Sequence, residues 1–533
     1  MTTSTEAPPM TNEQLSPPPA TPPGTPAPPT GGVPDLTDEL RATSIWTDEL
    51  VAAARLPVVD VPMVSIGGGI GSFILADVLR ISGLPTSSLR VIGNIDTPWQ
   101  TYEYLTKVSQ IPRHERLRSD STGCPDNVWG FPGYSVREAW NEKTIAPLFN
   151  VLTEPIFTDF YTPRAGQAFE AMAKEAERIG FDEMSWRGQV RMIRRRHGGG
   201  YFTAYRPADG SAPRVVVRSS FAHVAVGYPG LTFLPDLQRF RDTHGDRVRV
   251  VNAYEPHEHV YDTLRKRGGT VVVRGGGIVA SRILQRLMED RMHHGAQTQI
   301  VHLLRTFVHG PQKRSRFARR HGGNGLAYQG FNWPKSSWGG QLKDDFDRLE
   351  GDERKALYEQ LGGTHTPKRK LWQKQMEQAR REGWYSVTQG VVDSVEPEGD
   401  HRLALRLAAA NSAVSELTAD FVIDCTGLEG DIRSSALLAD LLDHGGAGRN
   451  PMGRLDVERS FEVRGTRTEP GRMYASGSAT LGGYYAGVDS FLGLQYAALR
   501  IADDLAATGF TNRIGIGRSA AQWWRWARNR SVE

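Results

Sequence analysis

VPMVSIGGGIGSFILADVL (residues 61–79) and TVVVRGGGIVASRILQRL (residues 270–287) share one pattern, and that pattern decides the fold. Each stretch begins with an apolar run of strand character, passes through three glycines and continues as an amphipathic run with helical spacing. A strand, a glycine turn and a helix in this order form the first half of a Rossmann-like βαβ unit. Two copies about two hundred residues apart predict two such units in one α/β chain.

The first turn has the spacing of a dinucleotide-binding fingerprint. Gly67 allows a tight turn after the strand, and Gly69 lets the backbone approach a pyrophosphate at the start of the helix, where unpaired N–H groups favour anions. Gly71 lies in the same turn, and Ser72 takes the third glycine position while staying small enough for close helix–strand packing. We therefore predict nucleotide binding here; the alternative is a purely structural glycine turn.

The strand that follows, LRVIGN (residues 89–94), ends at Asn94. Dinucleotide sites usually carry an acid at this point, which reads a ribose hydroxyl. Asn94 can hydrogen-bond that hydroxyl without carrying a charge, and Asp96 lies two residues further on as a substitute.

The second turn is the GxGxxA variant of the same fingerprint. It carries Gly275, Gly277 and Ala280, followed by Ser281 and a helix that we expect to end near residue 292. Arg274, directly before the glycines, stands where a small or apolar residue is usual. It either contacts the pyrophosphate or pairs with a carboxylate, and the sequence leaves both open.

The next strand, TQIVHLLR (residues 298–305), ends in Arg305, where an NAD site would carry an acid. A cation at this position suits a 2′-phosphate and favours NADP over NAD. The alternative is a solvated basic loop. The same alternatives apply to the basic residues that follow: Lys313, Arg314 and Arg316.

Composition limits the other function classes. The chain has 533 residues, 39% of them hydrophobic, which is enough for two or three domains. A formal net charge of +4 gives no reason to expect nucleic acid as the main partner. No run approaches the twenty apolar residues of a membrane span, and without the apolar core of a secretory signal we expect a cytoplasmic protein. Cys124 and Cys425 form no CxxC pair and cannot supply a four-thiolate metal site.

Residues 1–45 differ from the rest. They are rich in Pro, Thr and Ala, so we predict a disordered arm of polyproline character. Such an arm is either a solubilising tail or a docking segment for a proline-reading partner or a compartment shell.

Between the two turns, the alternating run of residues 190–220 predicts a β-meander that leads into the strand end VAVG (residues 224–227). After the second turn, ADFVIDCTGLEGD (residues 419–431) provides a similar strand end. This order resembles the two-dinucleotide-binding-domain flavoproteins, in the branch of flavin-containing and N-hydroxylating monooxygenases. The resemblance implies FAD at the first turn and NADPH at the second.

The resemblance extends to the closing segment GRMYASGSATLGGYYAGVDS (residues 471–490). In that family a YAxGD stretch touches the ribityl chain of FAD and a final helix points its N-terminus at the flavin. Here Gly477 and Ser478 take those positions, with Ser instead of Asp, and the helix is expected to begin near Asp489 or Ser490. Asn94 and Ser478 thus replace both acids expected at FAD, and the linker fingerprint FxGxxxHxxxW of flavin monooxygenases is not found.

The resemblance covers roughly residues 56–510 and implies a division of the chain. The implied segments are an FAD domain in two parts, 56–227 and 426–515, an NADPH domain 228–425 with a helical insertion 341–383, and a Trp/Arg-rich tail 516–533. We expect the tail to form an amphipathic helix docked on the body rather than a patch for nucleic acid or membrane.

Other candidate residues lie in loops. The irregular stretch of residues 109–140 and the stretch 323–340 are expected to contact cofactor or substrate, the alternative being surface connections. Their candidates are Arg113, Arg116, Asp126, Asn127 and Trp129 in the first, and Asn332, Trp333 and Lys335 in the second. The cluster Glu255, His257, His259 and Asp262 matches no familiar ligand spacing, so we predict no metal.

Three functions remain open. The first is a monooxygenase in which NADPH-reduced FAD activates O2 toward a small organic substrate. The second is a flavin-dependent reductase or dehydrogenase with another acceptor, and the third a non-catalytic redox-sensing or scaffold flavoprotein recruited by its proline-rich arm. No side chain is required as an acid or base, so no catalytic residue is predicted. The sequence leaves homo-oligomerisation open.

Overall fold

The computed structural model describes residues 35–117, 123–153, 161–210, 214–309, 322–323, 325–327, 340–361, 370–399, 401–408 and 415–532. Several predicted features lie outside these ranges: most of the proline-rich arm (1–34), the basic residues Lys313, Arg314 and Arg316, and the loop residues Asn332, Trp333 and Lys335.

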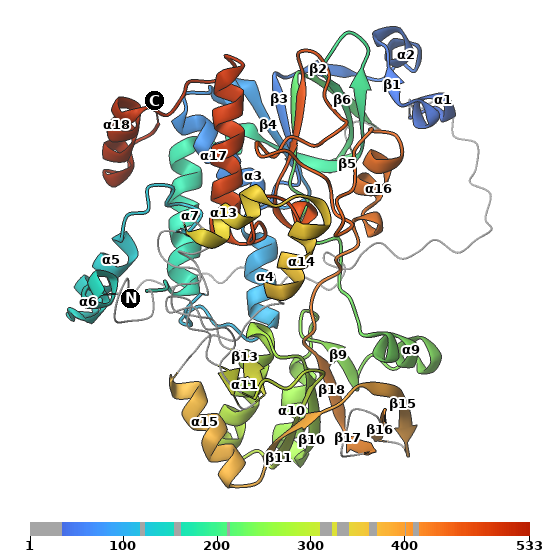
Figure 1. Cartoon of the computed structure of the whole chain (residues 1–533), viewed down its shortest axis with the longest axis vertical. Helices are drawn as coiled ribbons and strands as arrows, with labels where there is room; N and C mark the ends of the chain where they lie inside the picture. Colours follow the sequence, from blue (N-terminus) through green and yellow to red (C-terminus); the bar gives the residue numbers. More distant parts are fainter. Residues whose placement is uncertain are drawn as a thin grey trace.

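The first sheet occupies the upper half of Figure 1 and has the strand order β19-β8-β3-β4-β5-β6-β7-β2, with β1 paired to β5. The strands are β1 (Ile45–Trp46), β2 (Val58–Asp60), β3 (Met63–Ile66), β4 (Leu89–Gly93), β5 (Ser185–Arg196), β6 (Tyr201–Pro207), β7 (Val215–Ser219), β8 (Phe221–Val224) and β19 (Arg472–Ala475). From β19 to the start of β5 all pairs are parallel, and β5, β6 and β7 form the predicted antiparallel meander.

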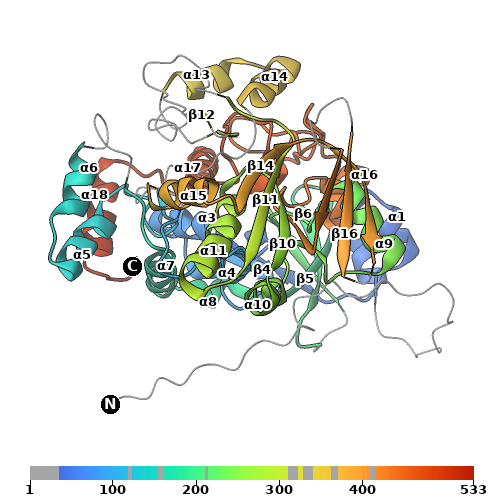
Figure 2. The same ribbon diagram turned by 90° about the horizontal axis from the view of Figure 1, so that it is seen from below.

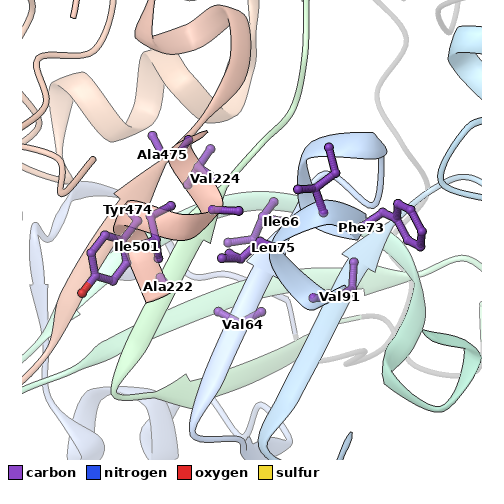
Figure 3. Close-up of a cluster of buried hydrophobic side chains, with 14 of the residues drawn as sticks. Val64, Ile66, Phe73, Leu75, Val91, Ala222, Val224, Tyr474, Ala475 and Ile501 are labelled. Carbon is purple, nitrogen blue, oxygen red and sulfur yellow. The ribbon is translucent and has the colours of Figure 1, made fainter. Parts of the chain in front are cut away.

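Helices pack the first sheet into a layered core. One apolar cluster joins β3, β4, β8 and β19 to four helices. These are α3 (Ile70–Ile81), α7 (Ala165–Ile179), α16 (Ala436–Asp443) and α17 (Phe491–Ala507). Figure 3 shows its centre, where Val64 and Ile66 of β3 lie between Val224 and Val91. Every residue of β3 is buried, as expected for a strand covered on both faces.

The second sheet lies in the lower half of Figure 1, with the all-parallel order β14-β11-β10-β18-β9. Its strands are β9 (Val250–Asn252), β10 (Gly269–Arg274), β11 (Thr298–Leu304), β14 (Tyr385–Gln389) and β18 (Phe421–Asp424). One apolar cluster joins it to α10 (Glu258–Arg267), α11 (Ile278–His294) and α15 (Lys370–Arg381). A second cluster joins it to α9 (Pro235–His244) and to the small sheet of β15 (Val392–Glu398), β16 (Arg402–Leu407) and β17 (Glu416–Ala419).

All five strands of the second sheet fall between β8 and β19 of the first sheet in chain order. The chain therefore leaves the first sheet after β8, builds the second Rossmann-like sheet and returns at β19. The predicted α/β fold, with one Rossmann-like unit inserted in another, is confirmed.

The remaining elements lie around these two sheets (Figure 2). They are α1 (Asp38–Ala42), α2 (Asp48–Ala53), α4 (Gln100–Val108), α5 (Gly133–Glu142), α6 (Ala146–Thr153), α8 (Phe181–Met184), α13 (Gln341–Arg348), α14 (Gly351–Leu361), α18 (Ile516–Ala527), the short pair β12 (Gly322–Gly323) and β13 (Leu326–Ala327), and the 3-10 turns η2 (Thr86–Ser88), η5 (Ile432–Ser434) and η6 (Gly477–Thr480). No helix in the described ranges is both long and apolar enough to cross a membrane.

The arm is shorter than the composition predicted. Leu36, Leu40 and Trp46 are buried against β5, β6 and β7, and the indole N–H of Trp46 donates to the Leu40 carbonyl oxygen at 2.9 Å. Assigning residues up to 45 to a disordered arm was wrong, because these three apolar side chains bury enough surface to fold α1 and β1 onto the sheet.

The helical stretch 341–383 divides between the two halves of the molecule. Trp372, Met376 and Ala379 of α15 are buried in the second sheet's cluster. By contrast, α13 and α14 pack on the loop that follows β19, where the Tyr484 ring lies between the guanidinium groups of Arg354 and Arg459, at 3.7 and 4.6 Å from its centroid. The stretch is therefore not a single insertion within one unit. Its helices α13 and α14 attach the connection between β11 and β14 to the first unit, whereas α15 belongs to the second.

Candidate functional site

The predicted residues of the first unit converge at one edge of its sheet. The strands β3, β4, β8 and β19 are parallel neighbours, so their carboxyl ends lie side by side. Gly67 follows β3, Asn94 follows β4, Gly227 comes shortly after β8, and Gly477 shortly after β19. Ligands of doubly wound α/β sheets bind at this edge.

The first glycine of the turn is required by its neighbour in the sheet. Gly67 has φ 128°, and a Cβ built on it would lie 2.2 Å from the carbonyl oxygen of Ala225, just beyond the end of β8. Its N–H is also used, donating to the Ile92 carbonyl oxygen at 2.9 Å. Gly67 therefore serves close packing of the turn against the adjacent strand end.

Gly69, the last of the three consecutive glycines, has open space where a side chain would lie, unlike Gly67. A Cβ built on Gly69 would meet only the Pro98 carbonyl oxygen, at 3.9 Å. Gly69 caps α3 without any side-chain acceptor, and the first intrahelical hydrogen bond runs from the Phe73 N–H to the Gly69 carbonyl oxygen, at 3.0 Å. The preceding N–H groups of the first turn point out of the helix, as an anion site requires.

Gly71 and Ser72 face the interior. A Cβ on Gly71 would lie 3.1 Å from the Ala225 Cβ and 3.3 Å from the Ser476 hydroxyl, so this glycine permits the close approach of α3 to the strand ends. Ser72 is fully buried, and its hydroxyl lies 2.9 Å from that of Ser65 on β3. The side chain of Ser72 thus bonds within the protein, and any ligand contact of this residue is left to its backbone.

A buried histidine under the turn was missed by the sequence reasoning. Nδ1 of His223 on β8 lies 2.8 Å from the Ser65 hydroxyl, and its Nε2 lies 2.9 Å from the Ser476 hydroxyl after β19. Burial lowers the pKa of His223 to about 3, so the ring is neutral at pH 7. His223 therefore joins three neighbouring strands directly beneath the glycine turn.

The residues expected to read the ribose and ribityl groups lie at the same edge. Asn94 is exposed directly after β4, whereas its proposed substitute Asp96 forms an ion pair with Arg187. Gly477 has φ 79° and begins the turn η6, in which Ser478 is buried.

The final helix begins where the sequence placed it. Ser490 caps α17 by accepting a hydrogen bond from the Gly493 N–H at 3.1 Å, so the helix starts at Phe491. Next to it, exposed Asp489 accepts a hydrogen bond from the Tyr228 hydroxyl at 2.7 Å. Burial and this carboxylate raise the pKa of Tyr228 above its usual value, so the phenol stays protonated.

The second turn repeats the geometry of the first. Gly275 has φ 123°, and a Cβ on it would lie 2.8 Å from the carbonyl oxygen of Cys425, just beyond the end of β18. Gly277 caps α11 without a side-chain acceptor. Ala280 is buried, and the Ser281 hydroxyl donates to the Ile278 carbonyl oxygen at 2.6 Å.

A buried histidine again supports this turn. Nε2 of His302 on β11 lies 2.6 Å from the Gly275 carbonyl oxygen, and its Nδ1 lies 3.0 Å from the Tyr385 hydroxyl. Burial lowers the pKa of His302 to about 4. This residue was also missed, since a histidine in an apolar strand carries no pattern of its own.

The two cations beside the second turn have separate roles. Arg274 is buried and forms an ion pair with Asp236, which decides between the two alternatives in favour of a carboxylate partner. Arg305 is exposed directly after β11, and its side chain has no partner among the residues that the structure describes.

Polar contacts connect the two units near the turns. Arg282 of α11 donates to the Gln110 carbonyl oxygen at 3.0 Å and to Glu115 at 2.7 Å, both in the loop after α4. The Gln110 side chain donates to Glu258 of α10 at 2.7 Å. The first two turns of α11, which follow Gly277, are thereby held against the first unit.

Most of the candidate side chains in residues 109–140 form hydrogen bonds or ion pairs with other groups of the protein. Arg113 pairs with Glu103, Arg116 pairs with Glu138, Asp126 accepts a hydrogen bond from Tyr134 at 2.5 Å, and Asn127 donates to the Phe131 carbonyl oxygen at 2.8 Å. Trp129 lines a groove beside α18. These side chains shape the loop itself.

The described residues contain no cluster of three or more His, Cys, Asp or Glu side chains that could hold a metal. Instead, Nε2 of His257 lies 2.9 Å from the Tyr261 hydroxyl, and Nε2 of His259 lies 2.9 Å from the Val248 carbonyl oxygen.

No protein-family model and no curated protein sequence matches the chain. Solved structures do. An ornithine hydroxylase of Pseudomonas aeruginosa is 18% identical, with a TM-score of 0.58 over 84% of this chain and 99% of that one. An ornithine N-hydroxylase of Kutzneria sp. 744, solved with reduced FAD, NADP+ and L-ornithine, is 14% identical, with a TM-score of 0.61 over 85% and 100%.

A cadaverine monooxygenase of Erwinia amylovora, solved with FAD, is 13% identical, with a TM-score of 0.60 over 85% of this chain and 95% of that one. At these identities the likeness establishes the fold alone: the chain has the fold of these proteins over most of its length.

The two outer glycines of the first turn are expected to respond differently to a methyl group. Gly67→Ala should lower the free energy of unfolding by several kcal/mol, because the new Cβ meets the Ala225 carbonyl oxygen and an L-residue is strained at this φ. Gly69→Ala should cost less than about 1 kcal/mol, since the site has room. Urea unfolding measures both; equal costs would contradict the assignment of Gly69 as the open position.

The neutral state of His223 predicts a pH dependence of stability. The pKa of His223 is about 3 in the folded protein and about 6.5 in the unfolded chain. Between these two pH values the side chain takes up a proton when the protein unfolds. Its contribution is therefore present above pH 6.5 and lost as the pH falls, by about 1.4 kcal/mol per pH unit. His223→Gln should remove one such slope between pH 4 and 6 in urea titrations. Exposed His197→Gln is the control, and an unchanged slope in His223→Gln would refute a neutral His223.

Proposed function

We propose that the protein is an FAD-dependent oxidoreductase that uses NADPH to reduce the flavin and hydroxylates a small organic amine with O2. One observation carries the proposal: in each of the two sheets a glycine turn follows a strand with parallel neighbours and leads into a helix that has no side-chain cap, in a chain whose fold matches amine hydroxylases. The overall reaction consumes R–NH2, O2, NADPH and H+ and yields R–NHOH, NADP+ and H2O.

The residues of the first turn suit FAD. The open side of Gly69 leaves space for a pyrophosphate, and the uncapped start of α3 offers N–H donors and the positive end of the helix dipole to it. Asn94 is exposed at the position of the ribose reader. Gly477, Ser478 and the start of α17 beside Asp489 line the same edge, where the ribityl chain and flavin ring of the resembling family lie.

The residues of the second turn suit NADPH. Gly277 opens α11 without a side-chain cap, and Ala280 and Ser281 keep its first turn compact. Arg305 extends from the end of the neighbouring strand as a cation with no described partner, which favours a phosphorylated ribose. Arg282 holds the start of α11 against the first unit.

FAD, when bound, supplies the two-electron redox chemistry. The chain's own contribution is positioning: Gly67 and Gly275 fix the two turns, and the helix starts would hold the pyrophosphates. The half-buried ring of Tyr102 packs on the buried ring of Phe491 beside the start of α17, with centroids 4.9 Å apart. No acid or base among the described side chains is assigned to the chemical step.

A disulfide reductase receives no support from the thiols. Cys124 and Cys425 are both buried, and neither takes part in a disulfide. Burial also raises the pKa of the Cys425 thiol, which makes it a poor nucleophile. A reductase that passes electrons to another acceptor is the second candidate, and the next experiment separates it from the first.

The purified protein should contain FAD, recognised by its absorbance after release, and NADPH should bleach that absorbance without oxygen. In air, NADPH oxidation should accelerate with an amine such as ornithine, lysine, cadaverine or putrescine, and a hydroxylamine should form in proportion. Fast reduction with no hydroxylamine from any amine would favour the reductase. No reduction by NADPH or NADH would exclude both enzyme assignments.

Reciprocal substitutions test the assignment of the two turns. Gly277→Val should retain FAD but lose NADPH-driven flavin bleaching, because the branched side chain fills the start of α11. Gly69→Val should lose FAD while staying folded, since its Cβ has room. FAD content and thermal unfolding are measured for both; NADPH reduction that persists in Gly277→Val would show the second turn to be misassigned.

Arg305 should set the preference for NADPH. Arg305→Ala is expected to raise the KM for NADPH about tenfold or more and to leave the KM for NADH nearly unchanged, because only NADPH carries the 2′-phosphate. Steady-state kinetics with both nucleotides give the ratio, and Arg433→Ala, an exposed arginine paired with Asp443, serves as the control. Equal effects on both nucleotides would argue against a phosphate contact.

A further inference from the structure

A groove of about 770 Å³ lies beside α18. Figure 1 shows this helix at one side of the first unit. Its walls carry the rings of Trp129, Trp523 and Trp524, and small residues of α18, Ser519 and Ala520, leave room between them. No charged residue is among its lining in the described part of the chain. Grooves walled by aromatic rings are the sites that recognise polyproline segments.

The groove is held in shape by the body of the protein. The indole N–H of Trp526 donates to the Asp126 carbonyl oxygen at 3.0 Å. The Phe131 ring packs on Trp523 and Trp526, with centroids 5.9 and 6.2 Å apart. The helix α18 is therefore docked through Trp526, and the other two tryptophans of the tail are left to form the groove.

The groove exposes apolar surface that a partner would cover. Trp524 is 51% exposed and Ile516 is 92% exposed. Large side chains of this kind, grouped in one place, mark binding surfaces. Proline rings pack on the faces of tryptophan rings, and a polyproline segment is already extended, so little entropy is lost when it binds.

We propose that this groove binds the proline-rich segment SPPPATPPGTPAPPTGGVP (residues 16–34) of a second copy of the chain. Nine of these nineteen residues are proline, and the spacing PxxP recurs at Pro19–Pro22, Pro23–Pro26 and Pro26–Pro29. This is the chemistry that an uncharged groove with tryptophan walls selects. The arm and its receptor would thus be two parts of one sequence.

Charge favours the same pairing. The first forty residues contain no Lys or Arg, and Glu6 and Glu13 precede the proline tract. Residues 510–530, which supply all of the groove's lining except Trp129, contain no Asp or Glu and five arginines: Arg513, Arg518, Arg525, Arg528 and Arg530. An arm with only acidic charges is therefore attracted to a segment with only basic charges.

The length of the arm requires a second copy. The described chain begins at Asp35, which pairs with Arg214, and Figures 1 and 2 show α1 and α18 on opposite sides of the first unit. At about 3.1 Å per residue, Pro17 reaches roughly 56 Å from Asp35. A compact chain of this size is on the order of 60 Å across, and the path over its surface is about 90 Å. The tract cannot span that path, so it meets the groove of another copy.

Peptide binding tests the groove. A synthetic peptide of residues 16–34 should change the tryptophan fluorescence of the full-length protein in a saturable way, and a peptide with Ala at positions 22, 23, 26, 28 and 29 should not. Trp524→Ala should weaken binding about tenfold or more. Trp140→Ala is the matched control, since Trp140 is 84% exposed on α5 outside the groove. Equal binding of the two peptides, or by the two variants, would overturn the proposal.

Association tests the second copy. Light scattering should show self-association of the wild type, and none for the chain lacking residues 1–34 or for Trp524→Ala. A mixture of the two variants should associate, because one supplies the groove and the other the arm. The full-length chain with the five Pro→Ala changes should behave like the deletion, which guards against misfolding of the shortened chain.

Other occupants give other results. Association that survives deletion of residues 1–34 but is lost in Trp524→Ala would assign the groove to the folded surface of a second copy. Co-sedimentation with phosphatidylserine–phosphatidylcholine vesicles that Trp524→Ala abolishes, with no peptide binding, would assign it to lipid. Either result would overturn the arm as its occupant.

Discussion

The close approach of each glycine turn to the next strand end is the constraint on which the rest of the structure depends. The Gly67 Cα faces the Ala225 carbonyl, and the Gly275 Cα faces the Cys425 carbonyl, so closely that neither position has room for a side chain. Ala225 and Cys425 belong to the strand ends through which the chain leaves the first sheet and later returns to it. Each glycine turn and the neighbouring strand end are therefore packed as one unit. This explains why both glycine turns of the chain are accompanied by such a strand end.

A buried histidine beside each turn stiffens this unit. His223 joins β3 to the segment after β19, and His302 holds the Gly275 carbonyl oxygen. In both cases burial lowers the pKa, and the neutral ring uses its two nitrogens for two separate strands. A polar network buried in this way is stable only when every member is bonded, so it favours a single arrangement of the strand ends.

The parts of the fold that follow local patterns could be predicted from the sequence. The β–glycine–α runs, the strand ends and the start of α17 all read correctly, because each depends on neighbours within a few residues. The roles of His223, His302 and Arg274 could not be predicted, since their partners lie on other strands or helices. The partners of the loop candidates Arg116 and Asp126 could not be predicted for the same reason: these side chains bond to Glu138 and Tyr134, which lie 22 and 8 residues further along the chain.

The interface between the two units decides how the two turns can work together. Its described contacts near the turns are polar: Arg282 bonds the loop at Gln110 and Glu115, and Gln110 bonds Glu258. Polar interfaces of this kind usually permit relative movement of domains. Here, however, Arg282 lies in the first two turns of α11, five residues beyond Gly277, so the start of that helix is anchored to the first unit. Arg282 is therefore one fixed point between the two glycine-turn edges, in addition to the contacts that α13 and α14 make with the loops of the first unit.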